Sequence, residues 1–72
     1  MLGEELRKAR EKAGLTQEEL SFRAKLDRSY ISLLENDHKS PTVDVLFRIC
    51  DALGTRPSRV LARVERKTRR SR

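Results

Sequence analysis

Aromatic residues are scarce in this chain of 72 residues, which has two Phe, one Tyr and no Trp. Strand-like alternation of apolar and polar residues is absent as well. No apolar run approaches the roughly 20 residues that a membrane-spanning helix needs, and no signal peptide is visible. These absences argue against a β-sheet protein and a membrane protein, and they favour a small helical domain.

Cysteine and histidine each occur once, as Cys50 and His38. A single cysteine cannot form an internal disulfide, which fits a cytoplasmic protein, and we expect Cys50 to be a buried apolar residue rather than a nucleophile. His38 has no second histidine or cysteine nearby, so we expect no metal site. Because the sequence also has no nucleophile beside a base and no glycine-rich phosphate loop, we expect no enzyme, no cofactor and no small-molecule ligand.

Positive charge is concentrated at the end of the chain. The formal net charge is +6, yet residues 1–62 contain 11 Lys/Arg against 10 Asp/Glu. Net charge alone is therefore weak evidence for a nucleic-acid partner. Residues 66–72 have five basic side chains and no apolar residue, so we expect one domain over residues 1–65 and a disordered tail over 66–72. The tail cations could contact DNA phosphates or simply stay solvated.

Apolar residues at helical spacing predict the scaffold. A first helix is expected from Leu2 to Ala13, ended by Gly14, and a fourth is expected after Thr42, ended by Gly54. The core stripe of the fourth helix is predicted to be Val43, Leu46, Ile49, Cys50 and Leu53. A fifth helix should begin near Pro57 and bury Leu61.

Residues 16–36 predict two short helices joined by a tight turn. Thr16 and Glu19 have the spacing of a capping box, and Asp27 can cap the second of these helices. Ile31 and Leu34 supply the buried face of the second helix. Two helices this short cannot bury their apolar faces alone, so the rest of the chain must be their scaffold.

The opposite face of the second helix in this pair has the residues best suited to reading DNA. Ser29, Ser32 and Leu33 lie away from the buried face, and Arg28 is long enough to reach over the helix end. Polar side chains held on a rigid helix suit the base edges of the major groove, where Leu33 could pack on a thymine methyl. The alternatives are a plain solvated face and, for Leu33, partial burial against the preceding helix.

Phosphate contacts are expected around this face. Thr16 and Gln17 begin a helix whose free N–H groups can approach the DNA backbone, although Glu18 limits that approach. Lys39, Arg23 and the Tyr30 hydroxyl are the further candidates.

Arg10 and Glu35 each border the core face of their helix, one turn beyond Leu6 and Ile31. We expect them to form an ion pair with each other. The alternative is that both side chains point into water.

Residues 2–62 resemble the Cro/C1-type (XRE family) helix-turn-helix domains of phage repressors and bacterial regulators. The resemblance rests on residues 15–20 (LTQEEL), 29–32 (SYIS), 34–36 (LEN), 40–42 (SPT) and 52–54 (ALG). Residues 26–32 also resemble the restriction–modification controller branch. Lys25 and Asp37 stand where the family often has glycine, so either position can require a left-handed backbone.

The resemblance implies an all-α fold, a compact five-helix lambda-repressor-like domain with the helix-turn-helix formed by its second and third helices. The implied function is sequence-specific binding of double-stranded DNA by a transcriptional regulator. Such proteins usually bind palindromic sites as homodimers, and we expect the dimer surface to include Phe47, Val60 and Val64. The alternatives are an antitoxin-like module that represses its own promoter, and a cationic chain that coats DNA or RNA without sequence preference.

Overall fold

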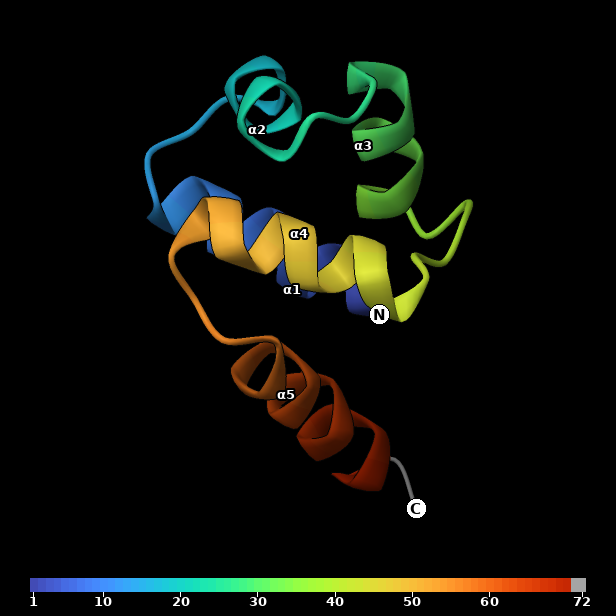
Figure 1. Cartoon of the computed structure of the whole chain (residues 1–72). Helices are drawn as coiled ribbons and strands as arrows, with labels where there is room; N and C mark the ends of the chain where they lie inside the picture. The colour runs from blue at the N-terminus through green and yellow to red at the C-terminus, as the bar shows by residue number, and fades with distance from the viewer. Residues whose placement is uncertain (71–72) are drawn as a thin grey trace.

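Five α-helices follow one another in the computed structural model, which describes residues 1–70 (Figure 1). Their bounds are α1 Leu2–Lys12, α2 Gln17–Ala24, α3 Arg28–Glu35, α4 Val43–Leu53 and α5 Pro57–Arg70. The predicted all-α fold is thereby confirmed.

The helices are arranged in three tiers. Helices α2 and α3 lie together at one end of the molecule, α5 lies at the other end, and α1 and α4 run between them (Figure 1). The contacts agree with this arrangement: α1 packs on both α3 and α5, and α4 packs on both α2 and α5. The α2–α3 pair is therefore presented at an end of a scaffold made by the other three helices.

A single apolar core joins all five helices. Its buried residues are Leu6, Leu20, Ala24, Ile31, Leu34, Leu46, Ile49, Cys50 and Val60. Two residues predicted to belong to the core do not: Val43 is 70% exposed and Leu61 is 46% exposed. Val43 is the first residue of α4, ahead of the turn that enters the core, and Val60 takes the core position on α5 that Leu61 was expected to fill.

Helix ends follow the predicted capping chemistry in two of three cases. Thr16 and Glu19 form the capping box, with Glu19 N donating to Thr16 Oγ1 at 3.0 Å and Thr16 N donating to Glu19 Oε1 at 2.9 Å. Val45 N donates to Thr42 Oγ1 at 3.2 Å. Asp27 occupies the N-cap of α3, but its side chain accepts no cap hydrogen bond.

The start of α1 touches the end of α3 through a glycine. A Cβ atom on Gly3 would lie 2.3 Å from the Leu34 carbonyl oxygen and 2.6 Å from that of Glu35, so no larger residue fits without a shift. Gly3 N donates to Asp37 Oδ1 at 2.9 Å, and the N-terminal ammonium also bonds to the Asp37 carboxylate. These hydrogen bonds lower the pKa of Asp37.

Helix α5 is longer than expected, because it continues through Arg70. The prediction of disorder from residue 66 was therefore wrong for residues 66–70, while residues 71 and 72 lie outside the described part. Lys67 Nζ lies 2.6 Å from Glu5 Oε2 and 2.9 Å from Glu4 Oε1. Glu5 is buried, so it needs a nearby cation, and the last turns of α5 supply one.

Lys25 and Asp37 both adopt the left-handed backbone, with φ of 57° and 58°, as their departure from glycine suggested. We expect Lys25→Gly to raise the free energy of unfolding by about 1 kcal/mol, because it removes Cβ strain. Asp37→Gly is the matched control, since it relieves the same strain but deletes the carboxylate that binds Gly3 N. Urea titration of both variants measures the effect; a loss of stability in Lys25→Gly would show that the lysine side chain stabilises the turn.

Candidate nucleic-acid interface

A left-handed turn sets the angle between α2 and α3. Lys25 ends α2 in the left-handed conformation, and Leu26 N donates to the Ser21 carbonyl at 2.9 Å. This is the bonding of a Schellman motif, in which the residue after the left-handed position returns to the core. Leu26 is half-buried against the core, so the turn is anchored and α3 leaves it in a fixed direction.

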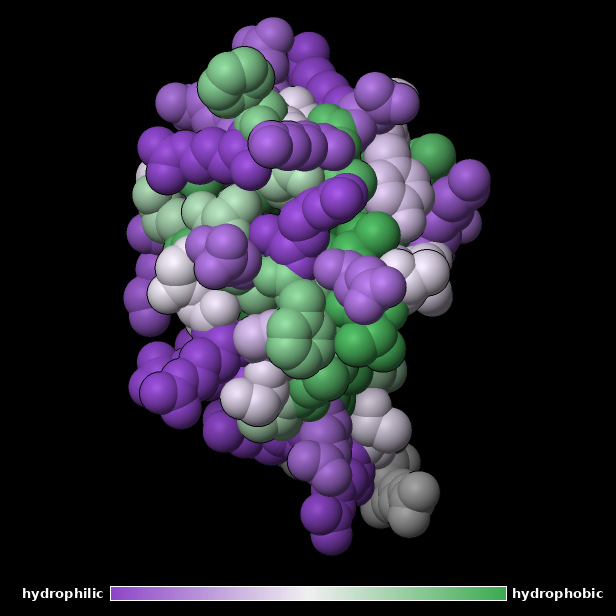
Figure 2. Space-filling model, in the orientation of Figure 1, coloured by the Kyte–Doolittle hydropathy of each residue, from purple (hydrophilic) through white to green (hydrophobic). Residues whose placement is uncertain are grey.

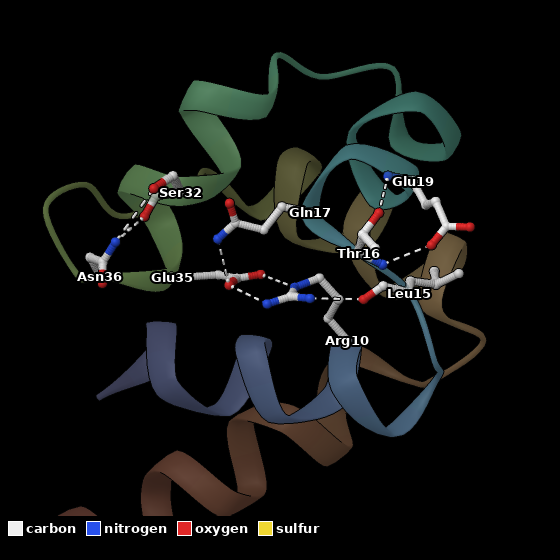
Figure 3. Close-up of polar contacts among 8 residues, drawn as sticks. All are labelled: Arg10, Leu15, Thr16, Gln17, Glu19, Ser32, Glu35 and Asn36. Atoms are coloured by element: carbon white, nitrogen blue, oxygen red, sulfur yellow. Dashed lines mark hydrogen bonds and ion pairs between the residues drawn. The ribbon is translucent and has the colours of Figure 1, made fainter.

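A buried ion pair then holds α3 to α1 (Figure 3). Arg10 Nε donates to Glu35 Oε2 at 2.7 Å and Arg10 Nη2 donates to Glu35 Oε1 at 3.0 Å, which realises the predicted pair in bidentate form. The side chains are 12% and 3% exposed. The hydrogen bond to Glu35 raises the pKa of Arg10.

Two further hydrogen bonds extend this pair, and neither was predicted. Arg10 Nη1 donates to the Leu15 carbonyl at 2.8 Å, and Gln17 Nε2 donates to Glu35 Oε1 at 3.1 Å (Figure 3). The network formed by Arg10, Leu15, Gln17 and Glu35, called the arginine network below, connects α1, the α1–α2 loop, α2 and α3. The start of α2 and the whole of α3 are consequently fixed as one unit.

The four residues predicted to read bases lie on one helix but differ in exposure. Arg28 and Ser29 are exposed, while Ser32 and Leu33 are half-buried. Asn36 Nδ2 donates to the Ser32 carbonyl at 2.9 Å and approaches Ser32 Oγ at 3.5 Å, so this serine already has a neighbour (Figure 3). Leu33 is not among the partly buried residues that pack against the core. Its partial exposure leaves an apolar surface beside Ser29 and Ser32.

The candidate phosphate-binding residues come from α2 and its N-cap, from α3, and from the loop after α3. Thr16, Arg23 and Lys39 are exposed, and Gln17 and Tyr30 are half-buried, with Tyr30 packed on the core. The Gln17 amide is bound to Glu35 and the Thr16 hydroxyl accepts a bond from Glu19. The groups that α2 offers to an anion are therefore the backbone N–H groups of Gln17 and Glu18, because the N–H of Glu19 already donates to Thr16 Oγ1.

The candidate dimer residues do not form one surface. Phe47 is 58% exposed and Val64 is half-buried, but Val60 is fully buried in the core of this chain, so including it in a dimer surface was wrong. Val43 and Leu61, which were assigned to the core, are exposed instead. Figure 2 shows apolar atoms gathered in the middle of the face over α4.

Residues 1–70 contain no group of three or more His, Cys, Asp or Glu that could hold a metal ion, and none of their helices is long and apolar enough to cross a membrane. Cys50 is buried, and this burial raises the pKa of its thiol.

Two short helices joined by a tight turn, with the second presenting an exposed polar face, define a helix-turn-helix domain. A family model described as helix-turn-helix matches residues 6–60. The chain belongs to this family, in its Cro/C1 (XRE) branch, which is a family of DNA-binding transcription regulators.

Relatives and solved structures agree with the assignment. The chain is 37% identical to the HTH-type transcriptional regulator y4dJ of Sinorhizobium fredii, over 75% of this chain and 70% of the relative. It is 34% identical to control protein C.BamHI of Bacillus amyloliquefaciens, over 85% and 76%. The structure of the restriction–modification controller protein C.AhdI from Aeromonas hydrophila superposes with a TM-score of 0.79 at 32% identity, covering 82% of this chain and 89% of that one.

Removing one member of the buried pair should strand a charge in the arginine network. We expect Arg10→Met and Glu35→Leu each to lower the free energy of unfolding by about 3–5 kcal/mol, and the double variant to recover much of the loss. Denaturant titration of the three variants measures this. Single variants within about 0.5 kcal/mol of the unaltered protein would contradict a structural role for the pair.

Proposed function

We propose that this protein is a sequence-specific regulator of transcription that binds double-stranded DNA through α3. The observation that carries the proposal is the rigid presentation of the α3 face by the arginine network. A helix fixed by contacts with α1 and α2 can place its side chains against base edges with a small ordering cost at binding. An α-helix also has the width that the major groove admits.

Each readout residue has a distinct chemical role in this proposal. Arg28 donates to guanine O6 and N7, the commonest specific contact in the major groove. Ser29 and Ser32 exchange hydrogen bonds with bases or phosphates, and Leu33 packs on a thymine methyl. The side chains differ in length and in polarity, so the α3 face distinguishes a short base sequence rather than a generic duplex.

Phosphate contacts set the register of α3 in the groove. The exposed cations Lys39 and Arg23 lie on either side of α3 along the chain, in the loop after α3 and on α2. The first-turn N–H groups of α2, next to Thr16 and Gln17, add a dipolar contact. The Tyr30 hydroxyl is the remaining phosphate contact we assign. These contacts position the protein and carry no sequence information of their own.

A single α3 reads only a few base pairs, so we propose that two copies bind a palindromic site with half-sites about 34 Å apart. Phe47 and Val43 on α4, with Leu61 and Val64 on α5, are the apolar residues that support a dimer surface. Phe47, Val43 and Leu61 are exposed and Val64 is half-buried. Exposed large apolar side chains are typical of surfaces that meet a partner when they form a contiguous patch.

The proposal is tested most directly by footprinting the DNA upstream of the gene for this protein. A discrete palindromic footprint is the expected result. Uniform protection along the duplex would instead support a chain that coats nucleic acid without preference. Stoichiometric co-purification of the product of a neighbouring gene would favour an antitoxin-like role.

Truncation of the guanine-reading residue should weaken specific binding. We expect Arg28→Ala to cost about 1–3 kcal/mol of affinity for the selected site and to relax preference at one base step. Arg48→Ala removes the same charge from an exposed position on α4 and serves as the control. Selection from a randomised duplex library gives the consensus site of each variant. An unchanged consensus with Arg28→Ala would show that Arg28 does not read a base.

A charge placed on the apolar face of α4 should oppose self-association. We expect Phe47→Asp to raise the dimer dissociation constant by about tenfold or more, because a buried unpaired carboxylate costs several kcal/mol. Phe22→Asp changes an even more exposed phenylalanine, 85% exposed on α2, and should leave the dimer intact. Sedimentation at several concentrations measures both variants; equal behaviour would locate the dimer surface elsewhere.

A further inference from the structure

Helix α5 has a row of arginines that the helix-turn-helix does not use. Arg59, Arg63 and Arg66 follow at spacings of four and three residues, which places them along one side of the helix. Arg59 and Arg66 are exposed and Arg63 is half-buried. The row became visible only because α5 continues as a helix past residue 65.

The arginine row borders a groove between α1 and α5. Two adjoining hollows share Arg63: one is also lined by Lys12 and Arg59, the other by Lys8, Arg66 and Glu5. The only carboxylate in the lining is Glu5, which is buried and lies 2.6 Å from Lys67 Nζ. In the described part of the chain, no carboxylate lies within ion-pair distance of Lys12, Arg59, Arg63 or Arg66. Lys8 and Lys67 in the lining are paired with Glu5, whereas these four cations give the groove positive charge that no ion pair within residues 1–70 neutralises.

This groove lies away from the proposed DNA-reading face. Helix α5 is at the opposite end of the molecule from α2 and α3, and α1 separates them (Figure 1). The groove also lies on a different side of α5 from the apolar surface. Viewed down the axis of α5, the three arginines lie about 60–120° from Val60 in one direction of rotation. Leu61 and Val64 lie about 40–100° from Val60 in the opposite direction. A ligand in the groove would compete neither with α3 nor with a dimer formed through α4 and α5.

The lining indicates the kind of ligand. The three aromatic residues, Phe22, Tyr30 and Phe47, do not line the groove, so it has no platform on which unpaired bases could stack. None of the strongly exposed large apolar residues lines it either, so it offers no anchor for a partner helix. Arginine forks match phosphate oxygens in geometry as well as charge.

The spacing of the arginines suits a duplex backbone. Seven residues of α-helix separate Arg59 from Arg66, a rise of roughly 10 Å. Each strand of a duplex carries a phosphate every roughly 3.4 Å along the duplex axis, so a row of this length faces a few phosphates of one strand. We propose that the α1–α5 groove binds the phosphate backbone of a second segment of double-stranded DNA, independently of α3. This inference goes beyond the proposed function, since it gives the protein two DNA-binding surfaces.

The test is a capture experiment with the full chain. Protein is loaded on a short immobilised duplex, and capture of a second, fluorescent duplex of unrelated sequence is then measured over a range of salt. We expect Arg59→Gln/Arg66→Gln to bind the immobilised duplex as the unaltered protein does but to capture the second one much more weakly. The slope of log capture against log salt should flatten by up to about 1.8, or 0.9 for each lost phosphate contact.

Two variants control the experiment. Arg7→Gln/Arg69→Gln also removes two exposed positive charges, but from outside the groove, and should capture the second duplex as the unaltered protein does. Arg59→Lys/Arg66→Lys keeps the charge and should retain most of the capture, which separates loss of contact from loss of folding. Circular dichroism of each variant confirms that its helices form.

Several outcomes would overturn the proposal. Absence of capture by the unaltered protein, or capture by the groove variant at the level of the Arg7/Arg69 control, would show that the groove binds no duplex. Equal losses in both double variants would reduce the effect to net charge. If the protein bound oligothymidine more tightly than the duplex, and the groove variant lost that binding, the groove would be a site for single strands. The same result with polyglutamate would make it a site for an acidic protein.

Discussion

Glu35 is a carboxylate with almost no access to water, and its need for compensation organises the structure. Moving such a charge out of water costs several kcal/mol unless hydrogen bonds and an opposite charge replace the lost hydration. Arg10 supplies two of those bonds and Gln17 supplies a third. Arg10, Gln17 and Glu35 come from α1, α2 and α3, so the hydrogen bonds that satisfy Glu35 also fix α3 relative to α1 and α2.

The same constraint explains the exposed face of α3. The helix has only eight residues, too few to be stable alone. Its inner residues Ile31 and Leu34 are buried in the core, Tyr30 packs against that core, and Glu35 is held by the arginine network. Arg28, Ser29 and Leu33 take no part in these contacts, so they are available for the proposed base contacts without a change in the scaffold.

Local rules predicted much of this fold from the sequence. The capping box at Thr16, the cap at Thr42 and the left-handed turns at Lys25 and Asp37 depend only on neighbouring residues. The predictions were wrong where two adjacent residues were equally suited to a core position, and where residues distant in the sequence determine the local structure. Val60 and Leu61 are both apolar, and only the packing of α5 on α1 and α4 selects Val60. The extension of α5 depends on Lys67 meeting Glu4 and Glu5, more than sixty residues away in the chain.

Within the candidate site, the exposure of Arg28 and Ser29 followed from helical spacing. The hydrogen bond from the Gln17 amide to Glu35 could not be predicted in this way, because it depends on the three-dimensional arrangement of the helices.

The unneutralised cations of the α1–α5 groove have a consequence for how the protein responds to ionic strength. Like charges held close together repel, and this repulsion weakens the folded state at low salt. Salt screens such exposed groups, whereas the pair in the arginine network is largely shielded from it. Added salt thus reduces the repulsion within the groove, and it also weakens phosphate contacts. In the proposed role of the groove, duplex DNA and dissolved ions are alternative counterions for one set of arginines, and the repulsion among these arginines is strongest under the dilute conditions that favour phosphate contacts most.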